Sequence, residues 1–281
     1  MNPILPRVAA VHDVSGFGKC ALTIALPVLS ACGVEVCPLP TAVLSANTDF
    51  AGFQMVDLTD AMPRFLQHWQ AMGLHLDAVY SGFLGSAEQM DDIERMVQLF
   101  HPALTLVDPV CGDDGLVYKT YTPAMCARLR SLMGIADVIT PNLTEACVLT
   151  DTPYDTCRTD AAAVRCLAER LRETGAKSVI ITGIERDGLL CNCILDETGY
   201  DERAVPLLPF RMHGTGDLFA SVLTGGLMTG HSLRESVDSA ARFTAFAMEK
   251  SVRYDGAFQR GVCFEPYLHL LAGGVFTGET A

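Results

Sequence analysis

The sequence lacks a long hydrophobic run and a basic cluster, and each absence excludes a class of protein. No apolar run reaches the length of about 18 residues that a membrane-spanning helix requires. The first residues, MNPILPRVAAVHD, contain no long apolar segment, so we expect no signal peptide. The net charge is −13 and no dense group of Lys and Arg occurs, whereas nucleic-acid-binding proteins usually carry a basic stripe. We therefore expect neither a membrane nor a nucleic acid as a partner.

Paired cysteine motifs are absent too, although cysteine itself is frequent. The 11 cysteines form no C-x-x-C pair, and their number is odd. Most of them stand in apolar segments, where a free thiol behaves as a small hydrophobic side chain. Disulfide frameworks belong to short secreted chains, so this pattern favours a reducing compartment. We expect a cytoplasmic protein.

Nothing in the sequence divides the chain into parts. There is no linker rich in proline, glycine or serine, no internal repeat and no segment of low complexity. The composition, with 49% hydrophobic and 19% charged residues, is that of an ordinary globular protein. A chain of 281 residues can bury one large core, and we expect a single domain over residues 1–281.

Short apolar runs alternate with longer amphipathic stretches. The runs predict strands over 7–13, 34–43, 77–85, 104–110, 136–142 and 177–184, and a strand pair over 188–196 and 203–210. The amphipathic stretches predict helices over 19–32, 58–72, 86–100, 122–133, 159–174, 216–228 and 232–250. This alternation predicts an α/β fold with a mostly parallel central sheet and helices on both faces.

Each predicted strand of the parallel sheet ends in polar residues or glycines. Right-handed crossovers place the carboxyl ends of such strands at one edge of the sheet. Ligands of open α/β sheets bind outside that edge. Six segments of this kind in series predict a binding site, and they are 12–19, 41–50, 81–86, 108–115, 140–145 and 182–183.

Acidic residues follow two of these strands. Asp108 and Asp113 flank a turn and can hold Mg²⁺, which prefers oxygen ligands, but aspartate also stabilises turns without any ligand. Asn142 can cap the helix that follows it, with Glu145 at the third helical position. That capping role is the favoured interpretation of the motif by itself, and it is compatible with a place in a binding site.

The segment HGTGDLFAS, residues 213–221, places glycines directly before a helix. Gly214 and Gly216 allow a tight turn that points several backbone N–H groups at one spot. The helix N-terminus adds unpaired N–H groups, so the segment predicts an anion hole for a phosphate. Asp217 can accept a proton there from an attacking hydroxyl, or it can simply stabilise the helix dipole. The segment is neither a Rossmann fingerprint nor a Walker A loop.

Four motifs in this order resemble the ribokinase-like superfamily of small-molecule kinases, and within it the pyridoxal/pyridoxamine kinases. G-T-G-D at 214–217 opens a late helix, as in that superfamily. V-D-P-V-C-G-D at 107–113 and T-P-N-L-T-E at 140–145 are similar to two motifs of the vitamin kinases. P-L-P-T-A-V-L-S-A-N-T-D-F at 38–50 is similar to the segment of pyridoxal kinases that runs through S-N-H-T-G-Y.

This resemblance implies a three-layer ribokinase-like fold and a phosphoryl-transfer reaction. The γ-phosphoryl group of ATP would pass to the 5′-hydroxymethyl group of pyridoxal, pyridoxamine or pyridoxine. The family also implies Mg²⁺ as a cofactor and a homodimer as the assembly, and it leaves a requirement for K⁺ open. The reaction asks a protein mainly for positioning and charge stabilisation, which fits a site made of backbone amides and carboxylates.

The resemblance also implies a role for each matching residue. Asp217 matches the catalytic base, and the anion hole matches Gly214, Thr215 and Gly216. The positions around the nucleotide are Asp108, Asp113, Asn142, Glu145, Thr182 and Gly183, and the metal ligands among them are Asp108, Asp113 and Glu145. The vitamin pocket is matched by Ser15, Thr41, Thr48, Asp49 and Phe83, together with Asp217.

Some positions depart from the pyridoxal kinase pattern. Typical members end the first strand in Q-S-H, whose serine touches the pyridine ring, whereas here His12, Asp13 and Ser15 compete for that role. Cys111 replaces a methionine, and His213 has no role that the sequence explains. Hydroxymethylpyrimidine kinases usually have T-G-C where this chain has T-G-D, so Asp217 favours the pyridoxal side. A non-catalytic vitamin-binding protein on the same fold is the alternative from another class, since a fold does not imply an activity.

Overall fold

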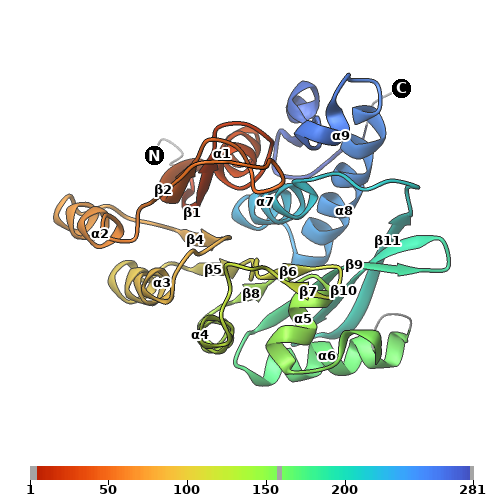
Figure 1. Cartoon of the computed structure of the whole chain (residues 1–281), viewed down its shortest axis with the longest axis horizontal. Helices are drawn as coiled ribbons and strands as arrows, with labels where there is room; N and C mark the ends of the chain where they lie inside the picture. Colours follow the sequence, from red (N-terminus) through yellow and green to blue (C-terminus); the bar gives the residue numbers. More distant parts are fainter. Residues whose placement is uncertain (1–4, 157–159, 279–281) are drawn as a thin grey trace. The chain divides into compact units, whose positions relative to one another are not determined.

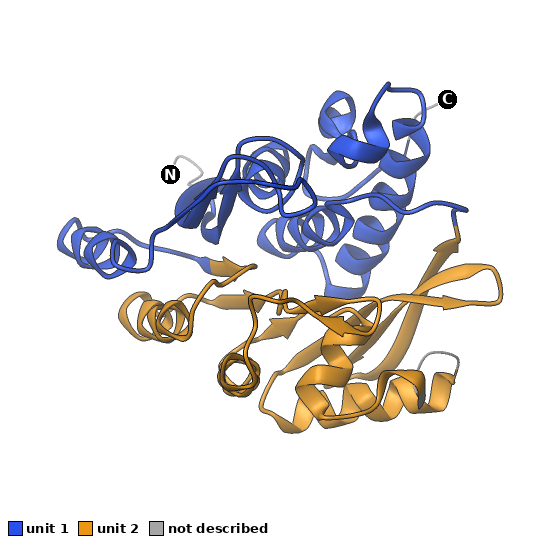
Figure 2. Ribbon diagram, in the orientation of Figure 1, with its two compact units in different colours: residues 1–78, 208–281 blue, residues 79–207 orange. Residues whose placement is uncertain are grey.

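The structure is a computed structural model that describes residues 5–156 and 160–278 (Figure 1). The chain folds into two compact units, which Figure 2 draws in blue and orange. The first unit joins residues 1–78 to residues 208–281, and the second unit consists of residues 79–207. Segments far apart in the sequence therefore build the first unit together.

The first unit combines three strands with helices from both ends of the chain. Its strands are β1 (Arg7–Ser15), β2 (Glu35–Leu44) and β3 (Met55–Asp57). Its helices are α1 (Leu22–Ala31), α2 (Met62–Ala71), α7 (Thr215–Met228), α8 (Leu233–Ser251) and α9 (Ala257–Arg260), followed by the 3₁₀ segment η2 (Glu265–Leu271). β1 pairs with β2 in parallel, and β2 pairs with β3 in antiparallel orientation. Most of β1 is buried, as its apolar sequence predicts.

The second unit follows the same alternation. Its strands are β4 (Ala78–Ser81, of which residue 78 belongs to the first unit), β5 (Leu104–Val107), β8 (Val138–Ile139), β9 (Ser178–Arg186), β10 (Leu189–Asp196) and β11 (Gly199–Pro206), plus the hairpin of β6 (Gly112–Asp113) and β7 (Leu116–Val117). Its helices are α3 (Ala87–Phe100), α4 (Pro123–Met133), α5 (Leu143–Thr150) and α6 (Ala161–Glu173), with the short η1 (Tyr154–Thr156). β5, β8 and β9 are parallel, and β9, β10 and β11 are antiparallel.

The α/β fold class predicted from the sequence is confirmed, with mostly parallel strands flanked by helices. The predicted strand pair is real, but its second strand is Gly199–Pro206 instead of 203–210. Pro209, which cannot donate to a strand ladder, lies beyond its end. Neither β3 nor the β6–β7 hairpin is predicted from the sequence, because their strands have only two or three residues each. The division into two compact units leaves the expectation of one domain over 1–281 as a prediction.

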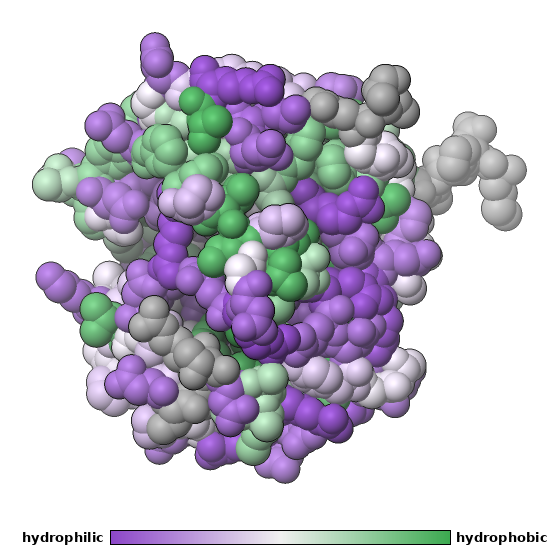
Figure 3. All heavy atoms as spheres, turned by 90° about the vertical axis from the view of Figure 1, so that its right-hand side faces the viewer, coloured by the Kyte–Doolittle hydropathy of each residue, from purple (hydrophilic) through white to green (hydrophobic). Residues whose placement is uncertain are grey.

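The face drawn in Figure 3 is mostly hydrophilic, and its hydrophobic residues form small groups. Among the helices of residues 5–156 and 160–278, none is long and apolar enough to cross a bilayer.

Glycines on α7 allow the helices of the first unit to approach closely. A Cβ atom at Gly225 would lie 2.5 Å from Sγ and 2.8 Å from Cβ of Cys32, at the end of α1. A Cβ atom at Gly226 would lie 2.6 Å from Oγ of Ser236 on α8. Because α7 begins at the glycine loop, this packing fixes the helix whose N-terminus carries that loop.

Gly225→Ala should therefore destabilise the protein, although alanine is the better helix former by about 1 kcal/mol. The added methyl group overpacks the α1–α7 contact, and overpacking typically costs about 1–3 kcal/mol. Urea unfolding measures the change in the free energy of unfolding. The double variant with Cys32→Ala, which removes the crowding sulfur, should recover part of the loss. A neutral or stabilising effect of Gly225→Ala alone would contradict this packing.

Candidate active site

The glycine loop at the start of α7 has the backbone shape that the sequence predicts. Gly214 is the N-cap of α7 and has a φ of 83° in the left-handed region. A Cβ atom at this position would lie 2.5 Å from the carbonyl oxygen of Lys19, so glycine is required there. Gly216 has open space around it and is exposed. The first turn of α7 thus meets solvent through residues without bulky side chains, as an anion hole requires.

Asp217 lies in the first turn of α7, and groups close to its carboxylate change its pKa. Burial raises the pKa of Asp217, while a backbone hydrogen bond from Ala21 and the charge of His213 lower it. The net result is a pKa above the ordinary value of 3.8. A raised pKa makes a carboxylate a stronger base once it is ionised.

Ala21 has a strained backbone conformation at this position. Its φ is 49° and its ψ is −128°, outside the regions that residues with a side chain prefer. Such strain costs about 1–3 kcal/mol and typically occurs at functional sites. Here it accompanies a backbone hydrogen bond to Asp217.

A second carboxyl group, that of Asp13, lies at the end of β1 near Asp217. Burial, and then the charge of Asp217, raise the pKa of Asp13 to about 6. The Ser15 hydroxyl donates a hydrogen bond to Oδ2 of Asp13 over 3.2 Å and partly offsets this rise. His12 is fully buried, and burial lowers its pKa to about 3. Of the three residues that compete at this strand end, Asp13 is the one whose pKa responds to the charge of Asp217.

The loop after β2 holds two of the residues expected in the vitamin pocket. Thr48 and Asp49 are exposed there, whereas Thr41 is buried within β2. Oδ2 of Asp49 lies 3.1 Å from Nδ1 of His213, the residue before the glycine loop. The structure therefore brings Asp49 to the loop of Asp217.

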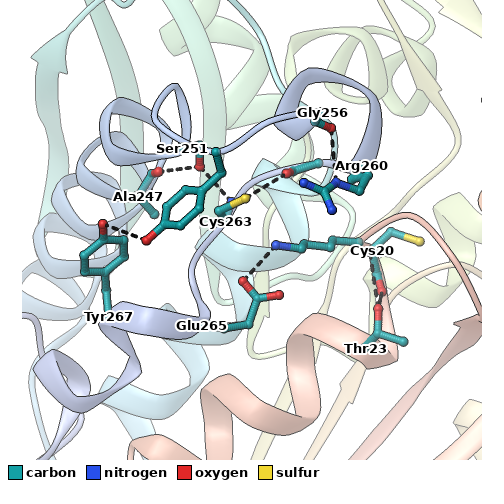
Figure 4. Close-up of polar contacts among 12 residues, drawn as sticks. Cys20, Thr23, Ala247, Ser251, Gly256, Arg260, Cys263, Glu265 and Tyr267 are labelled. Atoms are coloured by element: carbon teal, nitrogen blue, oxygen red, sulfur yellow. Dashed lines mark hydrogen bonds and ion pairs between the residues drawn. The ribbon is translucent and has the colours of Figure 1, made fainter.

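The segment after α8 forms backbone hydrogen bonds with residues next to the glycine loop. The N–H of Lys19 donates to the carbonyl of Arg260 over 2.8 Å, and the N–H of Val262 donates to the carbonyl of His213 over 3.1 Å. Nζ of Lys19 forms an ion pair of 2.8 Å with Glu265. Figure 4 shows this region, including the hydrogen bond of 2.7 Å from the N–H of Cys263 to Oγ of Ser251.

In the second unit, Glu145 and Asn142 form the predicted capping box of α5. The N–H of Asn142 donates to Oε2 of Glu145 over 2.8 Å, and the N–H of Glu145 donates to Oδ1 of Asn142 over 2.9 Å. Oε1 of Glu145 accepts a further hydrogen bond of 3.1 Å from the N–H of Cys111. The capping box thus also fixes the turn that follows β5.

The acids expected around the metal are electrostatically coupled. Burial raises the pKa of Glu145 well above its ordinary value, and the charges of Asp108 and Asp113 add to this effect. Asp108 is buried at the end of β5, whereas Asp113 is exposed in the hairpin. Among residues 5–156 and 160–278, no three His, Cys, Asp or Glu side chains are arranged to hold a metal ion by themselves. The assignment of metal ligands therefore remains a prediction.

The remaining predicted residues also lie in the second unit. Thr182 forms an isolated bridge with Asn142, and its N–H donates to the carbonyl of Pro141 over 2.9 Å. Gly183 is exposed and has a φ of 74°. Phe83 is half-buried, 6.2 Å from the ring of Tyr121 in an edge-on arrangement. Thr182 is thus next to the α5 cap, whereas Phe83 belongs to a different unit from Ser15, Thr41, Thr48 and Asp49.

A model of the phosphomethylpyrimidine kinase family matches residues 26–260. The chain belongs to this family. The match spans most of both compact units and includes the glycine loop and the acidic turn.

Several known proteins are similar to this chain over most of its length. One of them is a Bacteroides thetaiotaomicron protein that is provisionally assigned as a phosphomethylpyrimidine kinase and was crystallised with pyridoxal. It is 37% identical to this chain, with a TM-score of 0.90 over 95% of this chain and 96% of its own. Pyridoxal kinase from Lactobacillus plantarum is 31% identical with a TM-score of 0.89, over 95% and 97%. The pyridoxine/pyridoxal/pyridoxamine kinase of Bordetella avium is 31% identical over 88% of this chain and 86% of its own length. These similarities confirm the resemblance to the pyridoxal kinases.

The pKa of Asp13 predicts a pH-dependent stability. A pKa of about 6 against the ordinary 3.8 corresponds to about 3 kcal/mol. Because the folded state binds this proton more tightly than the unfolded state, the stabilisation is complete below pH 3.8 and is lost as the pH rises through about 6. The side chain in Asp13→Asn carries no charge and does not lose this stabilisation. The free energy of unfolding of the variant minus that of the wild type should therefore increase as the pH rises over that range.

Urea unfolding at several pH values measures this difference. Asp60→Asn, at an exposed aspartate of the same unit, is the matched control and should follow the wild type. A constant difference between Asp13→Asn and the wild type from about pH 4 to about pH 7 would show that Asp13 has an ordinary pKa.

Proposed function

We propose that this chain transfers the γ-phosphoryl group of ATP to the 5′-hydroxymethyl group of pyridoxal, pyridoxamine or pyridoxine. The observation that carries the proposal is Asp217, a carboxylate with a raised pKa directly beside a glycine-lined helix N-terminus. Pyridoxal kinases are similar to this chain over most of its length, which supports the choice of substrate.

The glycine loop and Asp217 carry out the two parts of the transfer that the protein must supply. Asp217 accepts the proton of the vitamin hydroxyl while the oxygen of that hydroxyl attacks the γ-phosphorus of ATP. The backbone N–H groups of Gly214, Thr215 and Gly216 face the charge that develops on the transferred group. A binding protein without catalysis would have no use for a base at this position.

The vitamin and the nucleotide use different sets of residues in this proposal. Ser15, Thr41, Thr48 and Asp49 bind the vitamin, and Phe83 is a further candidate for this role. Asn142, Thr182 and Gly183 bind the nucleotide together with Asp108, Asp113 and Glu145. Ser15 is buried and donates a hydrogen bond to Asp13, so in this proposal it also orients that carboxylate.

Mg²⁺ fits the acids of the second unit by charge and donor type. The negative charges of Asp108 and Asp113 raise the pKa of Glu145, and a cation among them would offset this repulsion. Carboxylate oxygens are ligands that Mg²⁺ accepts while it keeps waters and phosphate oxygens in its shell. Asp108, Asp113 and Glu145 would hold it, and the ion would supply positive charge to the phosphates. K⁺ is a further candidate cofactor.

We extend the proposal to a cytoplasmic homodimer with one kinase domain over 1–281, as the resemblance to the pyridoxal kinases implies. Hydroxymethylpyrimidine is the second candidate substrate, because the matching family model is that of phosphomethylpyrimidine kinase. The T-G-D sequence at 215–217 favours the B6 vitamers.

An ATP-dependent kinase assay with pyridoxal, pyridoxamine, pyridoxine and hydroxymethylpyrimidine tests the proposal. We expect phosphorylation of at least one B6 vitamer by the wild type with a higher kcat/KM than for hydroxymethylpyrimidine. Asp217→Asn should lose about 10²-fold or more of kcat, the scale of a general base, with vitamin binding retained.

Asp238→Asn, at a partly exposed aspartate of α8, is the control for an unspecific loss of negative charge. No turnover on any of the four substrates would eliminate both kinase assignments and favour a binding protein. A near-normal kcat in Asp217→Asn would remove Asp217 from the role of base.

A further inference from the structure

His213 connects three segments of the first unit. It directly precedes Gly214, the N-cap of α7. Its ring Nδ1 lies 3.1 Å from Oδ2 of Asp49, in the loop after β2. Its carbonyl accepts the N–H of Val262, in the segment after α9, over 3.1 Å. Its side chain and its main chain thus hold the glycine loop to two different partners.

Both partners are themselves held by further contacts. The N–H of Asp49 donates to Oδ1 of the buried Asn47 over 3.1 Å, and the N–H of Asn47 donates to the carbonyl of Phe17 over 2.8 Å. On the other side, a Cβ atom at Gly261 would lie 3.0 Å from the carbonyl oxygen of His213. This contact would be tight for a side chain, and the φ of 95° at Gly261 lies in the left-handed region, so glycine is favoured where the two segments cross.

His213 also contributes charge to a region rich in acids. Its charge lowers the pKa of Asp217, against the effect of burial. The other titratable groups that act in this region are Asp13 on β1, Asp49 after β2 and the buried thiol of Cys20 before α1. The nearby ammonium group of Lys19 is paired with Glu265.

We propose that His213 is a positioning residue of the phosphoryl transfer: it holds the glycine loop against the loop of Asp49, and it acts electrostatically on Asp217. This inference rests on the proposed function, because His213 acts through Asp217 and the anion hole. His213 touches neither reacting atom. The two contributions of His213 are separable. The contact of its ring with Asp49, called the tie below, needs only a hydrogen-bond donor, whereas the electrostatic effect on Asp217, called the charge below, needs a positive ring.

Two variants separate the tie from the charge. His213→Asn retains an N–H donor near the position of Nδ1 but is neutral at every pH, whereas His213→Ala loses both contributions. The measurement is kcat/KM for pyridoxal from about pH 5 to about pH 9.

We expect His213→Asn to match the wild type at the alkaline end, because it retains the hydrogen-bond donor to Asp49. At the acidic end its activity should fall at a higher pH, because Asp217 ionises less readily without the positive ring. His213→Ala should show the same shift and also lose about 10-fold of kcat at every pH, since small misplacements of a site have effects of this size or larger.

His75→Gln is the matched control. Nε2 of His75 lies 3.1 Å from Oδ1 of Asp77 in the same unit, so this variant removes a histidine–aspartate pair of equal length. Its pH profile should follow the wild type. Urea unfolding of each variant tests whether the fold is retained.

An acidic limb in His213→Asn that coincides with that of an active wild type would overturn the role of the charge. A wild-type kcat in a folded His213→Ala would overturn the tie. If the wild type phosphorylates no B6 vitamer, the proposed function fails and this inference fails with it. The profile of the wild type therefore distinguishes the two kinds of failure.

Discussion

The proposed site depends first on the electrostatic interaction between two carboxyl groups of the first unit, that of the buried Asp13 and that of the half-buried Asp217. Burial raises the pKa of both groups, and the charge of Asp217 raises that of Asp13 further. The chain compensates with a hydroxyl from Ser15, a strained backbone donor at Ala21 and the charge of His213. A carboxylate in such an environment is held in place and is a stronger base than one in water.

The second unit stabilises its own group of acids in a different way. Both oxygens of Glu145 accept backbone N–H groups, so this side chain connects the start of α5 to the turn after β5. The pKa of Glu145 is nevertheless raised, because burial and the charges of Asp108 and Asp113 outweigh these hydrogen bonds. A group of residues that concentrates negative charge in this way is suited to a divalent cation. The first unit thus contains a base beside amide donors, and the second unit contains a group of acids.

The features that the sequence predicts are those whose cause is local. The capping box of Asn142 and Glu145 depends on residues three apart in T-P-N-L-T-E, and it is present. The left-handed turn at Gly214 likewise follows from one residue and the helix after it. The alternation of strands and helices is also local, because it depends on the spacing of apolar residues.

The features that the sequence does not reveal depend on contacts across long stretches of chain. Asp13 and Asp217 are separated by most of the sequence, and only folding brings their charges together. The pair of His213 and Asp49 is of the same kind. The strain at Ala21 leaves no trace in composition, because alanine at a positive φ has no sequence signature. The approach of Cys32 to Gly225 requires the packing of α1 on α7.

The proposed chemistry depends on Asp217 being held as a carboxylate with a raised pKa beside the glycine loop. Carbon-detected NMR titration of the aspartate side chains, with the Asp217 signal assigned by its loss in Asp217→Asn, measures this most directly. We expect Asp217 to titrate above 3.8. A titration midpoint at or below that value would contradict the central role given to this residue.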